Sequence, residues 1–249
     1  MAETRPPQGA QAALRALKLL KLFTLEKPEL TLAQISAMSE LNKTTTHRLL
    51  RALQSESLIE RNTATSTYRL GAGLMALGVQ ALASSDLRRR IRPLLRSLAS
   101  ETGETATLEV PVEGSMLILD EVAGSHLVAA TGHVGTRWLL HATSTGKAYL
   151  AFADDGMDHL IEPLSPVTAK TVVTVEDIQR QLTEIRKRGF AVAADELEVG
   201  YTGVAVVVRG VLGDVQGCIC LGGPTQRMNR KRCAELGTRL LGAVSRLQL

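Results

Sequence analysis

The 249-residue sequence predicts an α+β protein made of a small, mostly helical N-terminal domain and a larger domain with an antiparallel sheet. Three observations predict this division. Two helical patterns and a short hairpin pattern occupy residues 31–71, an apolar stretch without charge covers 72–85, and β-prone runs with Gly-containing turns follow from Thr105. Hairpin strands with helices set apart from them are typical of α+β folds. We therefore expect domains at 1–71 and 86–249, joined by a linker helix over 72–85.

The first predicted helix covers Ala10 to Leu25. Its apolar side chains surround most of its circumference, and only Arg15, Lys18 and Lys21 form a polar stripe. Such a helix has more apolar surface than one small domain can bury. We expect a second subunit to cover it, and burial beneath the following hairpin is the alternative.

A short second helix is predicted from Leu32. Thr31 and Gln34 have the spacing of a capping box, in which each side chain satisfies a backbone N–H of the first turn. Ile35 and Met38 follow Leu32 at helical spacing, so we expect all three side chains to face the core.

A third helix is predicted over 43–55, with Asn42 as its cap. Each helical residue advances by about 100°, so Thr46, Leu49, Leu50 and Leu53 share one sector. The opposite sector holds hydroxyl, imidazole and guanidinium groups, with no acid before Glu56. Such groups reach phosphates and base edges in a major groove wide enough for a helix.

The residues after this helix, LIERNTATSTYRL, predict a hairpin with a tip rich in Thr, Ser and Asn. Helix, turn, helix and hairpin together are typical of a winged helix-turn-helix, and a basic helical hairpin used only for packing is the alternative. We expect binding to double-stranded operator DNA. The expected contacts are Lys43, Thr44, Thr45, His47, Arg48 and Arg51 of the helix, and Arg61, Thr65 and Ser66 of the wing.

The charge distribution agrees with this expectation. Residues 1–85 contain ten bases and six acids, which leaves 19 of each sign in the rest of the chain from totals of 29 and 25. The whole net charge of +4 therefore lies in the front third, where nucleic acid is expected to bind. Aromatic residues make up only 3% of the chain, which argues against binding of single strands by base stacking.

Three cysteines are too few and too clustered for a disulfide framework and indicate a reducing compartment. The N-terminus lacks the order of a signal peptide, and no apolar run reaches the roughly 18 residues of a membrane span. We expect a cytoplasmic protein without membrane contact.

The larger domain begins with an amphipathic helix over 86–102. Five arginines cover its outer face, and we expect them to be solvated, with contact to DNA as the alternative. Pro93 is expected to kink or restart this helix. The strands are expected in TATLEV, SMLILDEVAG, HLVAAT, FAVAADE, VAVVVRG and VQGCICLGG, and the helices over 146–152, 175–188 and 227–247.

A candidate anion site lies in LHATSTGKAYLAF. Thr143, Ser144 and Thr145 come just before a helix that is expected to open with Gly146, so hydroxyls and free N–H groups meet the positive end of a helix dipole. Simple capping by these hydroxyls is the alternative. The TGK sequence lacks the first glycine and the magnesium-binding hydroxyl of a P-loop, which argues against nucleotide hydrolysis.

Cys218 and Cys220 alternate along one strand and should face the same side. Neither has ligand spacing with a histidine, so we expect buried small side chains and neither a thiolate enzyme nor a metal site. Asp195, Glu196 and Glu198 form an acidic cluster after a strand. We expect them in a solvated loop, and the alternative is that one of them contacts a polar group of a ligand.

Three segments together resemble the IclR family of bacterial transcriptional regulators. They are LNKTTTHRLLRALQSESLIERN with YRLG, LHATSTGKAYLA, and GFAVAADELEVGYTGVAVVVRGVLGDVQGCICLGGP, in order between about Ala10 and Leu247. The resemblance implies a winged helix-turn-helix, a linker helix and a GAF-like α+β effector-binding domain. It also implies homodimers, often pairing into tetramers on DNA, with contacts through the first helix and the linker.

The resemblance further implies an effector pocket lined by Ser144 and Thr145, by Gly203 and Val204, and by Cys220. We also expect Leu140 against the body of the effector and Asp195 as the polar contact of the acidic cluster. The chain has Ala193 where some members carry an acid, Gly203 where some carry Cys, and Cys220 and Gly222 where they carry serines. Fewer hydroxyls and more open volume favour a larger, partly apolar acid, aromatic acids included, over a small keto acid.

The sequence therefore predicts a ligand-responsive regulator, most simply a repressor, and not an enzyme. No metal or cofactor is expected. The competing class is a small-molecule enzyme with a regulatory DNA-binding front domain, based on the cysteines.

Overall fold

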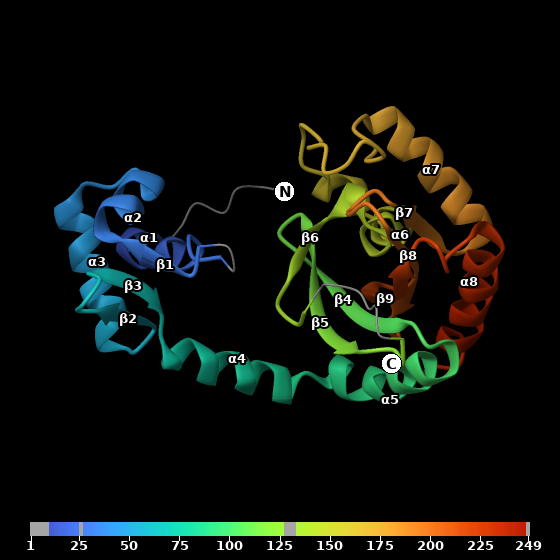
Figure 1. The fold of residues 1–249 in the computed structure, drawn as a ribbon, viewed down its shortest axis with the longest axis horizontal. Helices are drawn as coiled ribbons and strands as arrows, with labels where there is room; N and C mark the ends of the chain where they lie inside the picture. Colours follow the sequence, from blue (N-terminus) through green and yellow to red (C-terminus); the bar gives the residue numbers. More distant parts are fainter. Residues whose placement is uncertain (1–9, 25–26, 127–132, 248–249) are drawn as a thin grey trace. The chain divides into compact units, whose positions relative to one another are not determined.

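The computed structural model describes residues 10–24, 27–126 and 133–247, and the chain divides into two compact units between Ser84 and Ser85 (Figure 1). The N-terminal unit packs its first three helices on a small antiparallel sheet with strand order β1-β3-β2. Its elements are α1 (Gln11–Leu20), β1 (Glu29–Thr31), α2 (Leu32–Ser39), α3 (Lys43–Ser55), β2 (Ile59–Asn62), β3 (Thr67–Leu70) and α4 (Ala72–Ser84).

The predicted helix-turn-helix forms because caps and apolar positions agree. The Thr31 backbone N–H donates to Gln34 Oε1 (2.8 Å), and the Gln34 N–H donates to Thr31 Oγ1 (3.3 Å), which confirms the capping box. The Asn42 carboxamide oxygen accepts from the Thr45 N–H at 2.8 Å and starts α3. The bounds predicted for α3 are confirmed, as is its buried set of Thr46, Leu49, Leu50 and Leu53.

Two expectations for this unit were wrong, and one strand was missed. Helix α1 ends at Leu20, because the next N–H groups bond only three residues back in a tighter turn. Met38 is 44% exposed, since Ile35 is the buried residue of α2 and Leu41 supplies the next apolar contact beyond the turn. Strand β1 was missed because three residues give no clear period, and it adds a third strand beside β3.

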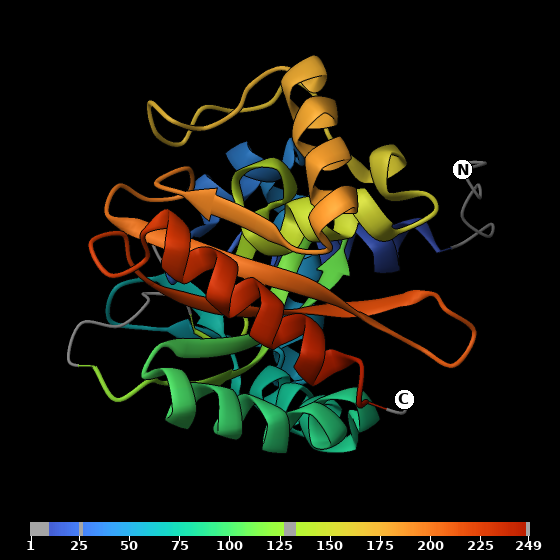
Figure 2. The ribbon, with the colours of Figure 1, turned by 90° about the vertical axis from the view of Figure 1, so that its right-hand side faces the viewer.

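The C-terminal unit has one six-stranded antiparallel sheet of order β6-β5-β4-β9-β8-β7 (Figures 1 and 2). Helices α5 and α8 pack on one face and α6 and α7 lie over the other. Its elements are α5 (Asp86–Thr102), β4 (Thr105–Val112), β5 (Ser115–Val122), β6 (Arg137–Leu139), η1 (Leu140–Ala142), α6 (Ser144–Phe152), η2 (Gly156–His159), α7 (Val175–Arg188), β7 (Ala191–Ala194), β8 (Tyr201–Arg209), β9 (Val215–Pro224) and α8 (Arg230–Val244). The predicted fold class is confirmed.

Side chains alternate across this sheet and fill two separate cores. Val204, Val206 and Ile219 pack against α5 and α8, whereas Ala205 and Cys218 pack against α6 and α7. This alternation decides which residues of β8 and β9 can reach a site beside α6.

Helices α5 and α7 have the predicted bounds, and α7 has the predicted Thr174 cap and a left-handed Gly189 at its end. Helix α5 continues through Pro93 without a restart. Pro93 and Arg89, whose carbonyl loses its helical hydrogen bond at the proline, both lie on the exposed side of the helix. Helix α8 is three residues shorter than expected at each end, β6 was missed, and all but His126 of the predicted strand HLVAAT lies outside the described residues.

The arginine face of α5 was only partly predicted. Arg88 and Arg92 both reach Asp120 of β5, whose side chain is buried. These two guanidinium groups are therefore tied to the sheet and are not freely solvated. Arg89 and Arg90 pair with Asp86 on the exposed side.

Candidate DNA-binding surface and effector cavity

Helix α3 presents the predicted polar face to solvent. Lys43, Thr44, Arg48 and Arg51 are exposed, and Thr45 and His47 are half-buried at the edge of this face. Within the described ranges, none of the basic side chains of α3 forms an ion pair. The basic groups of this helix are therefore not paired with any acid of residues 10–24 or 27–84.

The wing is the hairpin formed by β2 and β3, and it carries the other predicted contacts. The Arg61 guanidinium lies over the Tyr68 ring at 5.8 Å from its centroid, a cation–π arrangement that holds the arginine at the hairpin. Thr65 and Ser66 are exposed at the tip, where Asn62 Oδ1 accepts N–H groups of the turn. The structure thus places all nine predicted contacts on α3 and the wing of one unit.

A small, partly open cavity of about 20 Å³ lies between the first turn of α6 and the α6-facing side of β4, β8 and β9. Four of the predicted effector contacts line it, namely Ser144, Thr145, Gly203 and Cys220. The Ser144 hydroxyl lies 3.5 Å from the Cys220 sulfur and joins the helix start to β9. The other lining residues are Glu109, Trp138, Ala142, Thr143, Ala193, Leu197 and Tyr201.

The start of α6 differs from the prediction by two residues. The helix begins at Ser144, and the Thr143 hydroxyl is the cap that accepts the Gly146 N–H at 3.1 Å. Ser144 and Thr145 are therefore the first two residues of the helix, whose own carbonyls offer no acceptor to their N–H groups. An anion at this position would meet these groups directly.

Leu140, Asp195 and Val204 do not line this cavity. Val204 faces the opposite side of the sheet, because its neighbour Gly203 faces α6 and successive residues of a strand alternate. Leu140 is buried among the apolar side chains beneath α6. These two positions correct the predicted set, and Asp195 is occupied elsewhere.

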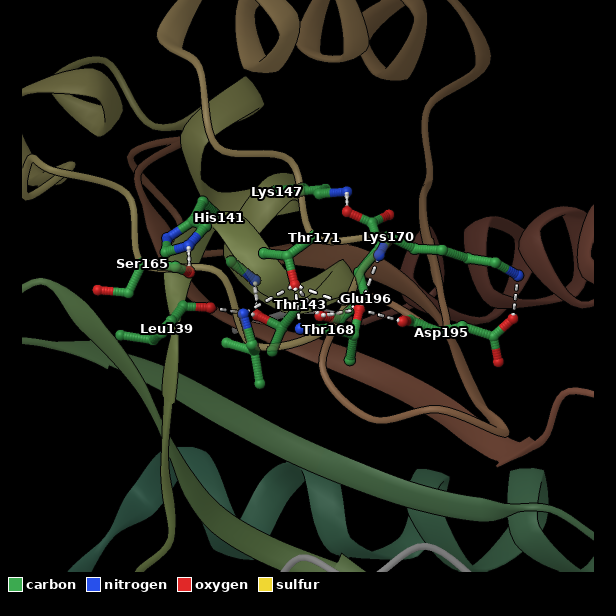
Figure 3. A network of polar contacts seen from close by, with 12 residues as sticks. Leu139, His141, Thr143, Lys147, Ser165, Thr168, Lys170, Thr171, Asp195 and Glu196 are labelled. Carbon is green, nitrogen blue, oxygen red and sulfur yellow. Dashed lines mark hydrogen bonds and ion pairs between the residues drawn. The ribbon is translucent and has the colours of Figure 1, made fainter.

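Asp195 and Glu196 form a buried network with α6 and the loop before α7, which corrects the expectation of a solvated loop (Figure 3). Asp195 accepts from Lys170 Nζ (2.5 Å), from the Thr225 hydroxyl (2.7 Å) and from the Gly200 N–H (2.8 Å). The hydrogen bond from Lys170, aided by the other two, lowers the pKa of Asp195 to about 2. These donors hold its carboxylate away from the cavity.

Lys147 of α6 also belongs to this network, and the sequence did not predict its role. Its side chain is 0% exposed, and its ammonium forms an ion pair with Glu196. Burial lowers the pKa of Lys147, and the charge of Glu196 opposes that shift. The Glu196 carbonyl accepts from the Thr171 hydroxyl at 2.6 Å, which fixes the chain after β7.

Glu109 is the one acidic residue that the structure describes in the lining of the cavity, and it was not among the predicted contacts. It lies on β4 opposite Cys218 of β9, is 5% exposed, and accepts hydrogen bonds from Thr107 Oγ1 (2.9 Å) and Thr145 Oγ1 (2.7 Å). Burial raises its pKa, and the two hydroxyls reduce that shift. The signal in the sequence was one acid in the otherwise uncharged strand TATLEV.

The cavity is less open than the glycines suggested. A Cβ on Gly222 would lie 2.0 Å from the Tyr201 hydroxyl, and one on Gly203 would lie 2.7 Å from Ser144 Oγ. The phenol therefore occupies the space that Gly222 leaves, and the serine hydroxyl occupies the space beside Gly203. The expectation of more open volume was wrong because it did not include these neighbours.

Cys218 and Cys220 are buried and face the same side of the sheet, as predicted, and this side is the one that α6 covers. Burial and the nearby Glu109 raise the pKa of Cys220 to about 12 and raise that of Cys218 as well. These thiols stay protonated at neutral pH, and the thiolate is the nucleophilic form. Within the described ranges, no group of three or more His, Cys, Asp or Glu is placed to hold a metal ion.

Two helices of the N-terminal unit expose apolar side chains. Leu17 of α1 is 53% exposed and Leu14 is also exposed, while α4 has no buried residue and exposes Met75, Leu77 and Val79. None of the helices that the structure describes is both long and apolar enough to cross a membrane.

Comparisons with known proteins agree with both units. The model of the IclR helix-turn-helix domain matches residues 12–63, and that of the bacterial transcriptional regulator IclR C-terminal domain matches residues 79–248. The transcriptional repressor IclR of Escherichia coli is 27% identical, over 99% of this chain and 92% of the repressor.

Solved structures show the same arrangement of elements. An IclR transcriptional regulator from Alicyclobacillus acidocaldarius is 25% identical with a TM-score of 0.82, and the match covers 94% of this chain and 96% of that protein. An IclR homolog from Microbacterium hydrocarbonoxydans, complexed with 4-hydroxybenzoate, is 24% identical with a TM-score of 0.76, over 94% of this chain and 98% of that one. The chain therefore belongs to the IclR family of bacterial transcriptional regulators.

Proposed function

We propose that this regulator is a cytoplasmic repressor that binds its operator as a dimer and responds to a small organic acid. Residues 1–71 would bind DNA, 72–85 would connect the domains, and 86–249 would bind the effector. The observation that carries the effector assignment is the cavity at the first turn of α6, where Ser144, Thr145, Gly203 and Cys220 meet. The neighbour complexed with 4-hydroxybenzoate supports including aromatic acids among the candidates.

DNA binding is proposed through Lys43, Thr44, Thr45, His47, Arg48 and Arg51 of α3, with Arg61, Thr65 and Ser66 of the wing along the phosphates. The support is a polar face whose bases have no acidic partner in the described parts of the chain. The effector would act only by binding one arrangement of the subunits better than another. An enzyme built on the cysteines is not favoured, because burial keeps their thiols protonated.

Ser144→Ala should weaken effector binding about tenfold. The hydroxyl and the adjacent N–H groups would donate to the carboxylate, and a charge-assisted hydrogen bond is worth about 1.5–3 kcal/mol. Trp138 is the single tryptophan and lines the cavity, so its fluorescence reports binding to the full chain. The titration uses aliphatic and aromatic acids beside their neutral amides. Equal affinity of acids and amides, or of wild type and Ser144→Ala, would leave the hydroxyls as a helix cap only.

Leu17→Glu should convert dimers into monomers. The exposed apolar sides of α1 and α4 are proposed to be covered by a second copy, since exposed apolar patches mark such interfaces. A monomer loses the second operator contact, so operator affinity should fall by about a hundredfold. Sedimentation measures the assembly, with Leu212→Glu on an exposed hairpin of the other unit as control. A wild-type monomer at micromolar concentration would disprove the dimer.

A further inference from the structure

The cavity contains one acid and no base. Glu109 is buried at its floor, and no Lys, Arg or His of the described residues lines the cavity or forms an ion pair with this carboxylate. A carboxylate has about four acceptor sites, and the hydroxyls of Thr107 and Thr145 fill two of them. Acceptor capacity therefore remains on a buried acid that has no counter-charge.

The strand opposite Glu109 is irregular at this point. The pairing of β4 with β5 shifts register between Leu108 and Glu109, where Leu119 of β5 is the extra residue, and such bulges are frequent beside functional sites. Thr105 lies on the same face of β4, four residues before Glu109, and its buried hydroxyl finds no partner among the described residues.

A plain organic anion fits this cavity poorly. Its carboxylate at the start of α6 would lie close to Glu109, because the Thr145 side chain contacts that acid while its N–H belongs to the first turn. Burial already raises the pKa of Glu109, and a second carboxylate this close would disfavour its ionised form further. A positive group next to the ligand's own carboxylate would remove the repulsion and give Glu109 its missing partner.

We propose that the effector is a small α-amino acid with an apolar side chain, whose ammonium group binds Glu109 and whose carboxylate binds the start of α6. This inference rests on the proposed function and names the class of acid. The Thr145 hydroxyl donates to Glu109 and the Thr145 N–H belongs to the first turn of α6, so the two proposed binding groups are adjacent, as the ammonium and carboxylate on one α-carbon are. Trp138, Leu197 and Tyr201 form the apolar wall, and they must move apart to admit the side chain, because the cavity of about 20 Å³ has room for about one water molecule.

The test titrates the full chain with alanine, valine, leucine and phenylalanine in the L form, each beside the same acid without its amino group. Trp138 fluorescence and calorimetry report binding. At least one amino acid should bind, and its deaminated partner should bind at least tenfold more weakly. Glu109→Gln should lose at least tenfold for that amino acid and should bind the deaminated acid better than wild type, which reverses the preference.

Two controls separate folding from recognition. Glu184→Gln makes the same change on the exposed side of α7 and should leave binding unchanged. Glu109→Gln should melt no lower than wild type at neutral pH, because burial raises the pKa of the folded carboxyl and its ionisation then disfavours the fold. A lower melting temperature would contradict this account of Glu109.

The experiment gives different results when the acid site at α6 is wrong and when only the amino-acid class of the effector is wrong. If deaminated acids bind as well as amino acids and Ser144→Ala weakens both, the acid site at α6 stands and the role of Glu109 is refuted. If no amino acid of the panel binds, the amino-acid class is refuted, while binding of other acids still tests the proposed function.

Discussion

Replacing Arg48 and Arg51 together with alanine should lower operator affinity by about 2–6 kcal/mol, since each arginine that reads a base edge contributes about 1–3 kcal/mol. Both side chains are exposed on the side of α3 opposite its buried leucines. No acid of the described residues pairs with them, so their removal leaves no unpaired partner inside the unit. The loss should therefore appear in DNA binding and not in folding. Fluorescence anisotropy on DNA from upstream of the protein's own gene measures it.

Two matched variants locate the effect. Lys43→Ala should weaken all sequences alike and reduce the dependence of binding on salt, as expected for a phosphate contact. Arg180→Ala removes an exposed guanidinium from α7 and should change nothing. A folded Arg48→Ala, Arg51→Ala protein with undiminished operator binding would refute the assignment of α3 as the recognition helix.

Lys147→Met should destabilise the C-terminal unit by about 3–5 kcal/mol, the usual cost of removing one member of a buried ion pair. The lysine is fully buried and its ammonium is the partner of Glu196, which is itself buried. Methionine keeps the length of the side chain and leaves the carboxylate without its cation. Denaturant unfolding followed by Trp138 fluorescence reports on this unit alone, because the chain has no other tryptophan.

The double variant Lys147→Met, Glu196→Leu isolates the cause. It removes both charges and should recover most of the lost stability, since an apolar pair of similar volume replaces a buried ion pair at little cost. A single variant within about 1 kcal/mol of wild type would show that the pair does not hold the loop after β7 onto α6.

Local signals predicted the helices well. Helices α3, α5 and α7 each combine a side-chain cap with an apolar stripe, and both ends were predicted correctly. Helix α6 is buried along nearly its whole length and has no polar stripe, so only its cap could mark its start. Capping by the whole run of hydroxyls was the alternative to an anion site, and in the structure Thr143 alone caps the helix.

The cavity was harder to predict than the helices, because its residues come from distant parts of the sequence. Gly203 and Val204 were predicted together, but neighbours on a strand cannot share a face, and this alternation could have excluded Val204. Lys147 pairs with an acid 49 residues away, and Tyr201 fills the space beside Gly222 on the adjacent strand. Such partners follow from strand order and register, which local patterns do not contain. Glu109 was visible as a lone acid in a buried strand.

The most direct test of the whole account is the operator affinity of the full chain with and without an acid that saturates the change in Trp138 fluorescence. The account predicts that such an acid shifts the operator dissociation constant by about 5–150-fold, the usual range of allosteric coupling. Ser144→Ala should need about ten times more acid for the same shift, while binding operator normally in the absence of acid. An acid that fills the cavity and leaves operator affinity unchanged would contradict the account.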